Sequence, residues 1–267
     1  MEVGMCIFSG IDYPEMVECF KKTGVKRTFV GSDIPEFDNV MKLFLENGII
    51  CETLHAPFRK INAMWGSDET AAKNMIDSIK DAIDKCHKYS IPVVIVHLSS
   101  GMPMPEMNEK GIERFEEVFD YADEKNVKVA LENQRYLENL DFFLNKYSDK
   151  GFCWDTGHEF ALSVDNRVKY MERFGKKTIA LHIQDNRCDF NKDDHLLPYD
   201  GSIDFDYVAK KIAESGYNGT LMLEVTKDAD LDGLKPYENM SSEEYIKRAY
   251  DAVCRLNDSV TAYRKGE

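Results

Sequence analysis

The chain has 267 residues, of which 43% are hydrophobic and 11% aromatic, and its formal net charge is −14. This length and apolar content are enough for one large core, so we expect a single domain over residues 1–267. The acidic balance argues against a general nucleic-acid-binding surface, because phosphate contacts need clustered lysines and arginines. No run reaches the roughly 18 apolar residues of a membrane span, which argues against a transmembrane helix.

The first residues, MEVGMCIFSG, lack the basic and long apolar regions of a signal peptide. The seven cysteines are odd in number, widely spaced, and form no C-x-x-C pair. This usage is typical of reduced thiols in a cytoplasm, so we expect a cytoplasmic protein without a membrane partner.

Short apolar runs rich in β-branched residues alternate with amphipathic stretches along the whole chain. Strands are expected at residues 3–9, 27–32, 49–57, 92–100, 127–133, 151–158, 178–185 and 220–225. Helices are expected at residues 14–24, 37–48, 69–90 and 112–126, with a last helix at about 241–264. This alternation produces parallel strands with right-handed crossovers, and eight strands are the number that a closed barrel needs. The predicted fold is α/β, a single-domain (β/α)8 TIM barrel.

Several predicted helices end at a residue that tolerates a left-handed backbone just before the next strand. These residues are Gly24, Gly48, Asn126 and Gly216. The two longest loops that follow strands, residues 56–69 and 226–240, are candidate lids over the barrel mouth. Trp65 in the first loop is a candidate for stacking on a sugar ring, and packing on the barrel rim is an equal alternative.

Five of the six histidines fall at the carboxyl end of a predicted strand or in the loop after it: His55, His97, His158, His182 and His195. In a barrel these ends converge on one face, so the histidines predict a site there. Hydrogen bonding at the mouth without metal is an alternative for His55 and His97, and a solvated imidazole is one for His195. His87 lies within a predicted helix and is expected to be structural or exposed.

The ends of the last four strands carry three carboxylates and one imidazole, from Glu132, Asp155, His182 and Glu224. A single glutamate at a strand end is most often an ion-pair partner. Four such groups together favour a site for one divalent ion, namely Mn²⁺, Mg²⁺, Co²⁺ or Zn²⁺, with positions left open for substrate oxygens. No Walker-type or strand-linked G-x-G-x-x-G motif occurs, so nucleotide cofactors are not implied.

Seven segments together resemble the xylose-isomerase-like TIM barrel superfamily of sugar isomerases, sugar epimerases and zinc-dependent abasic-site endonucleases. The segments are LHAPF (54–58), VVIVHLSSG (93–101), VALENQR (129–135), CWDTGHEFA (153–161), ALHIQDN (180–186), DDHLLPYDGSIDF (193–205) and MLEV (222–225). Their order and spacing span nearly the whole chain.

The resemblance to the ketose 3-epimerase branch implies roles for individual residues. Positions matching Glu132, Asp155, His182 and Glu224 hold one divalent metal there, and the two glutamates exchange the substrate proton. Positions matching His158, Glu138 and Arg187 bind substrate hydroxyls, and the sugar isomerases also use the remaining histidines for substrate oxygens. These histidines are His55, His97 and His195. The resemblance therefore implies a metal-dependent isomerase or epimerase of a sugar or sugar phosphate.

The chemistry is consistent with those residue types. A proton next to a ketone is hard to remove at neutral pH, because the carbanion is unstable without an electrophile to take its charge. A metal supplies that electrophile, and two carboxylates can remove the proton and return it. Return to the other face gives an epimer, and return to the neighbouring carbon gives an isomer. The sequence does not distinguish these outcomes.

An abasic-site endonuclease is the main alternative. Together with the four core ligands, five further residues match the nine metal-binding positions of the three-zinc endonucleases: His55, His97, His158, Asp193 and His195. The HLSSG and ENQRY segments depart from the endonuclease pattern, and no aromatic or arginine wedge for flipping a nucleotide is obvious. A small-molecule partner is therefore favoured over nucleic acid.

A barrel that binds metal without catalysis and serves as a partner subunit is a third possibility. The presence of Glu132 and Glu224 argues against it, because loss of a proton-transfer residue would be its simplest signature. Helices on the flank of a barrel permit a homo-oligomer.

Overall fold

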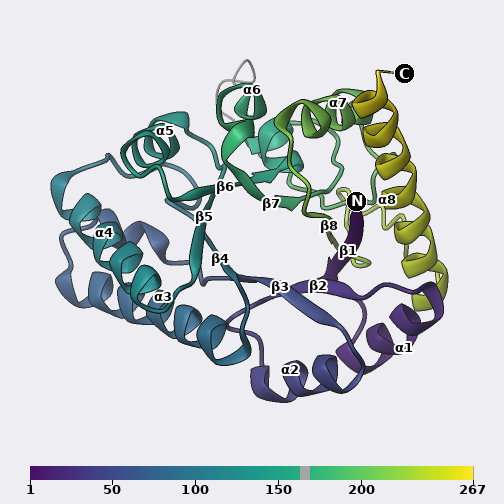
Figure 1. Cartoon of the computed structure of the whole chain (residues 1–267), viewed down its shortest axis with the longest axis horizontal. Helices are drawn as coiled ribbons and strands as arrows, with labels where there is room; N and C mark the ends of the chain where they lie inside the picture. The colour runs from purple at the N-terminus through teal and green to yellow at the C-terminus, as the bar shows by residue number, and fades with distance from the viewer. Residues whose placement is uncertain (163–168, 267) are drawn as a thin grey trace.

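The computed structural model describes residues 1–162 and 169–266, which form a ring of parallel strands surrounded by helices (Figure 1). The strands of this part of the chain are β1 (Glu2–Ile7), β2 (Arg27–Gly31), β3 (Ile50–His55), β4 (Val93–Val96), β5 (Lys128–Glu132), β6 (Gly151–Asp155), β7 (Thr178–His182) and β8 (Thr220–Val225). The α-helices between and after them are α1 (Tyr13–Thr23), α2 (Phe37–Glu46), α3 (Glu69–Tyr89), α4 (Glu109–Glu124), α5 (Leu137–Lys146), α6 (Tyr170–Phe174), α7 (Phe205–Ser215) and α8 (Ser242–Lys265). The predicted (β/α)8 TIM barrel is confirmed.

Strands β2 to β7 form one parallel sheet in chain order, and β1 pairs with β8 in parallel. The two groups meet where Ile183, just after β7, donates its amide to Met222 O of β8 at 2.9 Å. At the other junction Thr28 of β2 donates its hydroxyl to Met5 O of β1 at 2.9 Å. Figure 1 shows β1 beside β8, with α8 along their outer side. These contacts close the sheet into a barrel.

Local polar groups fix the helix ends. Asp68 accepts hydrogen bonds from the amides of Thr70 and Ala71 at the start of α3, each at 3.0 Å. Ser241 and Glu244 form a capping box at the start of α8. The four residues predicted to end helices all have a positive φ: Gly24 (82°), Gly48 (68°), Asn126 (56°) and Gly216 (77°).

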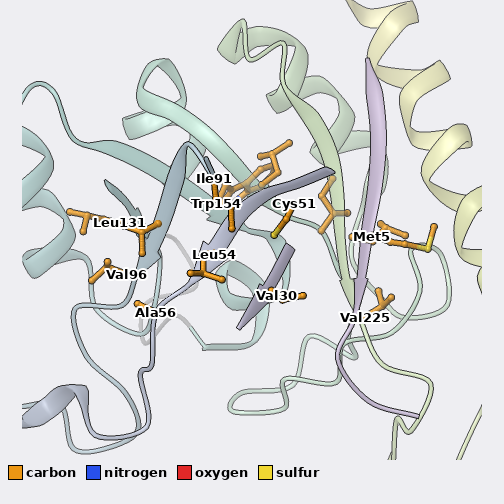
Figure 2. Close-up of a cluster of buried hydrophobic side chains, with 14 of the residues drawn as sticks. Met5, Val30, Cys51, Leu54, Ala56, Ile91, Val96, Leu131, Trp154 and Val225 are labelled. Carbon is orange, nitrogen blue, oxygen red and sulfur yellow. The ribbon is translucent and has the colours of Figure 1, made fainter. Parts of the chain in front are cut away.

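Alternate residues of each strand enter different parts of the core, because side chains of a strand point to opposite faces with a period of two. The larger cluster lies between the barrel and the helices. Figure 2 shows some of its members from successive strands, including Met5, Val30, Leu54, Val96, Leu131, Trp154 and Val225. Smaller clusters come from the residues one position out of phase, namely Val93, Ile95, Ala130, Cys153 and Ala180, and Cys6, Phe29 and Met222. These two smaller clusters line the barrel interior.

Within the described residues, no helix combines the length and the apolar character needed to cross a membrane.

Candidate metal centre

The four predicted metal ligands extend the inner face of the barrel to its carboxyl end. Each comes two residues after a residue of the inner clusters: Glu132 after Ala130, Asp155 after Cys153, His182 after Ala180, and Glu224 after Met222. The strand period of two therefore turns all four side chains toward the barrel axis. Small or apolar residues fill the interior below, and the polar ring lies above them at the mouth.

The four groups meet in space. One ligand atom from each of Glu132, Asp155, His182 and Glu224 can be chosen so that all lie within 4.8 Å of one another. His182 Nδ1 lies 3.2 Å from Glu132 Oε1 and 3.2 Å from Glu224 Oε2, so the two glutamates approach the same ring nitrogen. The ring of Phe29 stacks on the His182 imidazole, with centroids 4.4 Å apart. This stacking fixes the plane of the imidazole.

The charges of this group suit a cation. Burial raises the pKa of Asp155 to about 8. The negative charges of Glu224 and Glu132 also raise this pKa, whereas His158 lowers it. Burial acts in the same direction on Glu224, but His182 outweighs it and lowers the pKa of Glu224 to about 2. Three carboxylates close together repel one another, and a divalent ion would relieve that repulsion. The donor set therefore fits a hard or borderline metal.

A second polar group lies beside the first and centres on Asp193. Asp193 Oδ2 lies 3.3 Å from His158 Nε2 and 3.2 Å from His195 Nε2. Gln184 donates its side-chain amide to the other oxygen, Oδ1, at 2.8 Å. Burial opposes protonation of His195, but Asp193 outweighs burial and raises the pKa of His195 to about 10. The imidazole is therefore an ion-paired group rather than a solvated one.

His55 and His97 share one oxygen of Glu132. Oε2 of Glu132 lies 3.2 Å from His55 Nε2 and 2.9 Å from His97 Nε2, and the two nitrogens are 3.1 Å apart. Burial lowers the pKa of His97 to about 4, against the attraction of Glu132. His97 is thus a neutral imidazole at physiological pH, which is the form that ligates a metal or accepts a hydrogen bond.

The polar groups surround a cavity of about 280 Å³ at the barrel mouth. Its lining consists of His55, Phe58, His97, Ser100, Gly101, Glu132, Gln134, Arg135, His158, Leu162, Asn191, Asp193, His195 and Glu224. Asp155 and His182 are fully buried beneath it. All nine residues of the predicted metal constellation are therefore brought together, whereas three predicted substrate contacts are not.

The three are Trp65, Glu138 and Arg187. Trp65 is 5% exposed, donates its indole N–H to Leu98 O at 2.6 Å, and packs against Phe115. These contacts match the alternative prediction for Trp65, in which its ring packs against the protein and not on a sugar ring. Glu138 is an exposed residue in the first turn of α5. Arg187 is held in ion pairs with two aspartates outside the cavity lining, Asp194 and Asp232.

Two glutamines of the site were not predicted. Gln134 places its amide nitrogen 3.2 Å from His97 Nε2 and 3.0 Å from His158 Nδ1. Gln184 contacts Asp155 as well as Asp193, and its oxygen accepts from the backbone amide of His195 at 3.0 Å. Each glutamine follows a predicted ligand by two residues, Glu132 and His182 respectively. An amide side chain two positions after a predicted ligand is the sequence pattern that could have identified both glutamines.

The comparisons with known proteins agree with the fold. The family model described as "Xylose isomerase-like TIM barrel" matches residues 7–253. The uncharacterized protein y4fM of Sinorhizobium fredii is 30% identical over 205 residues, which cover 71% of this chain and 62% of that protein. The chain spans somewhat less than two thirds of the length of the first curated relatives that it matches.

Two more distant relatives carry functional names. An inosose isomerase of Bacillus velezensis is 24% identical over 70% of this chain and 69% of that protein. A probable endonuclease 4 of Cenarchaeum symbiosum is 26% identical over 56% of this chain and 61% of that protein.

Solved structures share the fold at low sequence identity. D-psicose 3-epimerase from Clostridium cellulolyticum H10 superposes with a TM-score of 0.74 at 17% identity, covering 94% of each chain. A structure of the IolI protein with a bound zinc atom gives a TM-score of 0.74 at 19% identity, covering 98% of this chain and 99% of that one. With the barrel and the match over residues 7–253, the chain belongs to the xylose isomerase-like TIM barrel family.

Proposed function

We propose that the chain is a divalent-metal-dependent isomerase or epimerase of a sugar or sugar phosphate. The observation that carries this proposal is the convergence of Glu132, Asp155, His182 and Glu224 beside a cavity of about 280 Å³. A cavity near 300 Å³ is at the small end of ligand pockets, which suits a compact polar molecule.

The four convergent residues would hold the ion. Asp155 and His182 lie beneath the cavity, and Glu132 and Glu224 lie on its wall, so one side of the group faces the space open to a substrate. When bound, a divalent cation would polarise the substrate carbonyl and make the neighbouring C–H bond more acidic.

Glu132 and Glu224 are the proposed proton-transfer groups. Burial acts to raise both pKa values, but the neighbouring histidines together outweigh burial, with His182 acting on both groups, so both carboxyls are ionised at neutral pH. An ionised carboxylate can accept a proton from carbon and return it. Their approach to one nitrogen of His182 from different strands, β5 and β8, supports a two-base arrangement around a substrate in the cavity.

The surrounding polar groups would orient the substrate. His158 and His195 are held by Asp193, and His97 is held by Glu132 and Gln134. These rings line the cavity and can bind hydroxyl oxygens in a fixed direction. Relatives named for an inosose isomerase and a D-psicose 3-epimerase support a polyhydroxylated substrate class.

Zinc-dependent cleavage of a phosphodiester at an abasic site is the second candidate. The specific observation in its favour is that His55, His97, His158, Asp193 and His195 line the same cavity as the four core ligands. A relative named as a probable endonuclease 4 points the same way. Such a site would bind two or three zinc ions rather than one.

A paired assay tests the two candidates. The Mn²⁺-loaded protein is incubated with a panel of ketoses, aldoses and their phosphates, and the Zn²⁺-loaded protein with a duplex containing one abasic site. The proposal predicts interconversion of at least one sugar and an intact duplex. Cleavage of the duplex without any sugar conversion would replace the first proposal by the second.

A further inference from the structure

Arg135 is a cation at the cavity mouth whose pairing is incomplete. It lies in the loop between β5 and α5, and its side chain lines the cavity with Ser100, Gly101 and Asn191. One nitrogen, Nη2, donates to Asn191 Oδ1 at 2.6 Å. Nε is buried and makes no hydrogen bond to any residue in the described part of the chain. A buried N–H without an acceptor costs stability, so its retention favours a ligand that supplies one.

Among the residues that the structure describes, the other arginines that are not exposed behave differently. Arg27 is paired with Glu2 and Glu52, Arg114 with Glu69, and Arg187 with Asp194 and Asp232. Arg135 has no carboxylate oxygen within 4.0 Å over residues 1–162 and 169–266. The chain carries 48 acidic side chains against 34 lysines and arginines, so a lone half-buried guanidinium is not explained by a lack of carboxylates.

Asp193 does not serve as the carboxylate partner of Arg135. It is the carboxylate that acts on Arg135 through its charge, but both of its oxygens are already engaged. His158 and His195 contact Oδ2, and Gln184 donates to Oδ1. The guanidinium is therefore free to meet a further anion from the cavity side.

We propose that Arg135 binds an anionic substituent of the substrate, a phosphate ester or a carboxylate, at the end of the cavity away from Asp155 and His182. This inference rests on the proposed isomerase or epimerase function and narrows its substrate class to a sugar phosphate or a sugar acid. A guanidinium presents parallel N–H groups that match the oxygens of either anion.

The neighbouring residue, Gln134, supports a cavity with a metal side and a separate end that binds the anion. Gln134 turns to His97 and His158 at the metal-side wall, whereas Arg135 turns to Asn191 at the mouth. Two consecutive residues thus reach two parts of one cavity. A substrate whose carbonyl lies beside Glu132 would extend its far end toward the guanidinium, and a terminal anion would be recognised there.

Equilibrium binding tests the inference without any need for turnover. Xylitol, xylitol 5-phosphate and xylonate are titrated by calorimetry into the Mn²⁺-loaded protein, into Arg135→Gln and into Arg135→Lys. The control variant is Arg255→Gln, which removes the same charge from an exposed arginine that lies over Tyr199 and does not line the cavity. Metal content is measured for every variant.

We expect one of the two anionic ligands to bind the wild-type protein at least roughly tenfold tighter than xylitol, since charge-assisted hydrogen bonds exceed neutral ones. The anion that binds more tightly than xylitol identifies the substituent as a phosphate or a carboxylate. Arg135→Gln abolishes the gain, Arg135→Lys keeps part of it, and Arg255→Gln keeps all of it.

Three results would overturn the inference. They are equal affinity for the three ligands, undetectable binding of both anions, and tighter binding of an anion than of xylitol that persists in Arg135→Gln. The proposed function fails by a different readout. Lack of sugar conversion with an intact Arg135-dependent gain refutes the isomerase proposal and leaves an anion site. Conversion of neutral sugars with no gain refutes the role of Arg135 and leaves the isomerase proposal standing.

Discussion

The side-chain amide of Gln184 donates to Asp193 Oδ1 at 2.8 Å and thereby joins the second polar group of the site to the first. The same nitrogen lies 3.4 Å from Asp155 Oδ1. Gly157 leaves room for this amide, because an added Cβ there would come 2.2 Å from Gln184 Cδ. One glutamine thus sets the distance between the metal-side carboxylates and the histidines of the mouth.

We expect Gln184→Leu to lower kcat/KM by roughly 10- to 100-fold with little loss of folding stability, the range typical for groups that orient metal ligands. Gly157→Ala should lower it in the same direction, because the new methyl group displaces the Gln184 amide. Steady-state kinetics on a converted sugar, with chemical denaturation alongside, measure both effects. Wild-type kcat/KM in both variants would contradict this positioning role.

Metal stoichiometry separates a mononuclear from a multinuclear centre. The four-ligand site predicts about one tightly held ion per chain after loading with Mn²⁺ or Zn²⁺ and gel filtration. Removal of that ion with a chelator should lower the melting temperature, because the ion binds the folded state alone. His195→Ala should change substrate affinity more than metal content. Two or three zinc ions per chain, with one lost in His195→Ala, would contradict the mononuclear account.

Metal affinity should depend on pH through Asp155. Its pKa of about 8 without metal means that the carboxyl holds a proton at pH 6, and a metal must displace that proton to bind. The His182 ring, whose pKa is well above its ordinary value, must also lose a proton. The association constant should therefore rise by roughly tenfold or more per pH unit from pH 6 to 8.

Titrations of Mn²⁺ into the metal-free protein at several pH values measure this slope, and Asp155→Asn removes one displaced proton and should reduce it. A constant affinity from pH 6 to 8 would show that Asp155 is ionised without metal, contrary to its burial among carboxylates.

Trp65→Phe separates packing from substrate contact. Loss of the indole N–H leaves the buried Leu98 carbonyl without its donor, which should cost about 1–3 kcal/mol of folding stability. KM should not change, because Trp65 does not line the cavity. Phe58→Leu is the matched control, since Phe58 does line the cavity and should alter KM instead. A raised KM in Trp65→Phe with unchanged stability would favour ring stacking on the substrate.

The barrel and the convergence of the four candidate ligands could be predicted because both depend on periodicity. The strand period of two places Glu132 and Asp155 on the inner face, two residues beyond Ala130 and Cys153, and the barrel brings those ends together. The predicted strand at residues 92–100 was too long, since β4 ends at Val96 and the residues after it turn into the mouth.

The parts that could not be predicted depend on loop side chains rather than on strands. Arg135 and Asn191 meet across 56 residues of sequence, and no local pattern indicates where a loop side chain will reach. Trp65 lies in a loop that forms a short 3-10 helix, Ile61–Trp65, and that helix turns its ring toward Phe115. The family resemblance placed Arg187 among the substrate contacts, whereas Asp194 and Asp232 hold it outside the cavity lining.

Deuterium incorporation tests the two-base claim most directly. The Mn²⁺-loaded protein, Glu132→Gln and Glu224→Gln are incubated in D2O with the panel of ketoses and ketose phosphates, and the carbon next to the carbonyl is followed by NMR. Metal content and folding of both variants are measured in parallel. The account predicts deuterium at that carbon with the wild-type protein and its loss, by roughly 100-fold or more, in each variant. Incorporation at the wild-type rate in both variants, or none with any substrate of the panel, would contradict it.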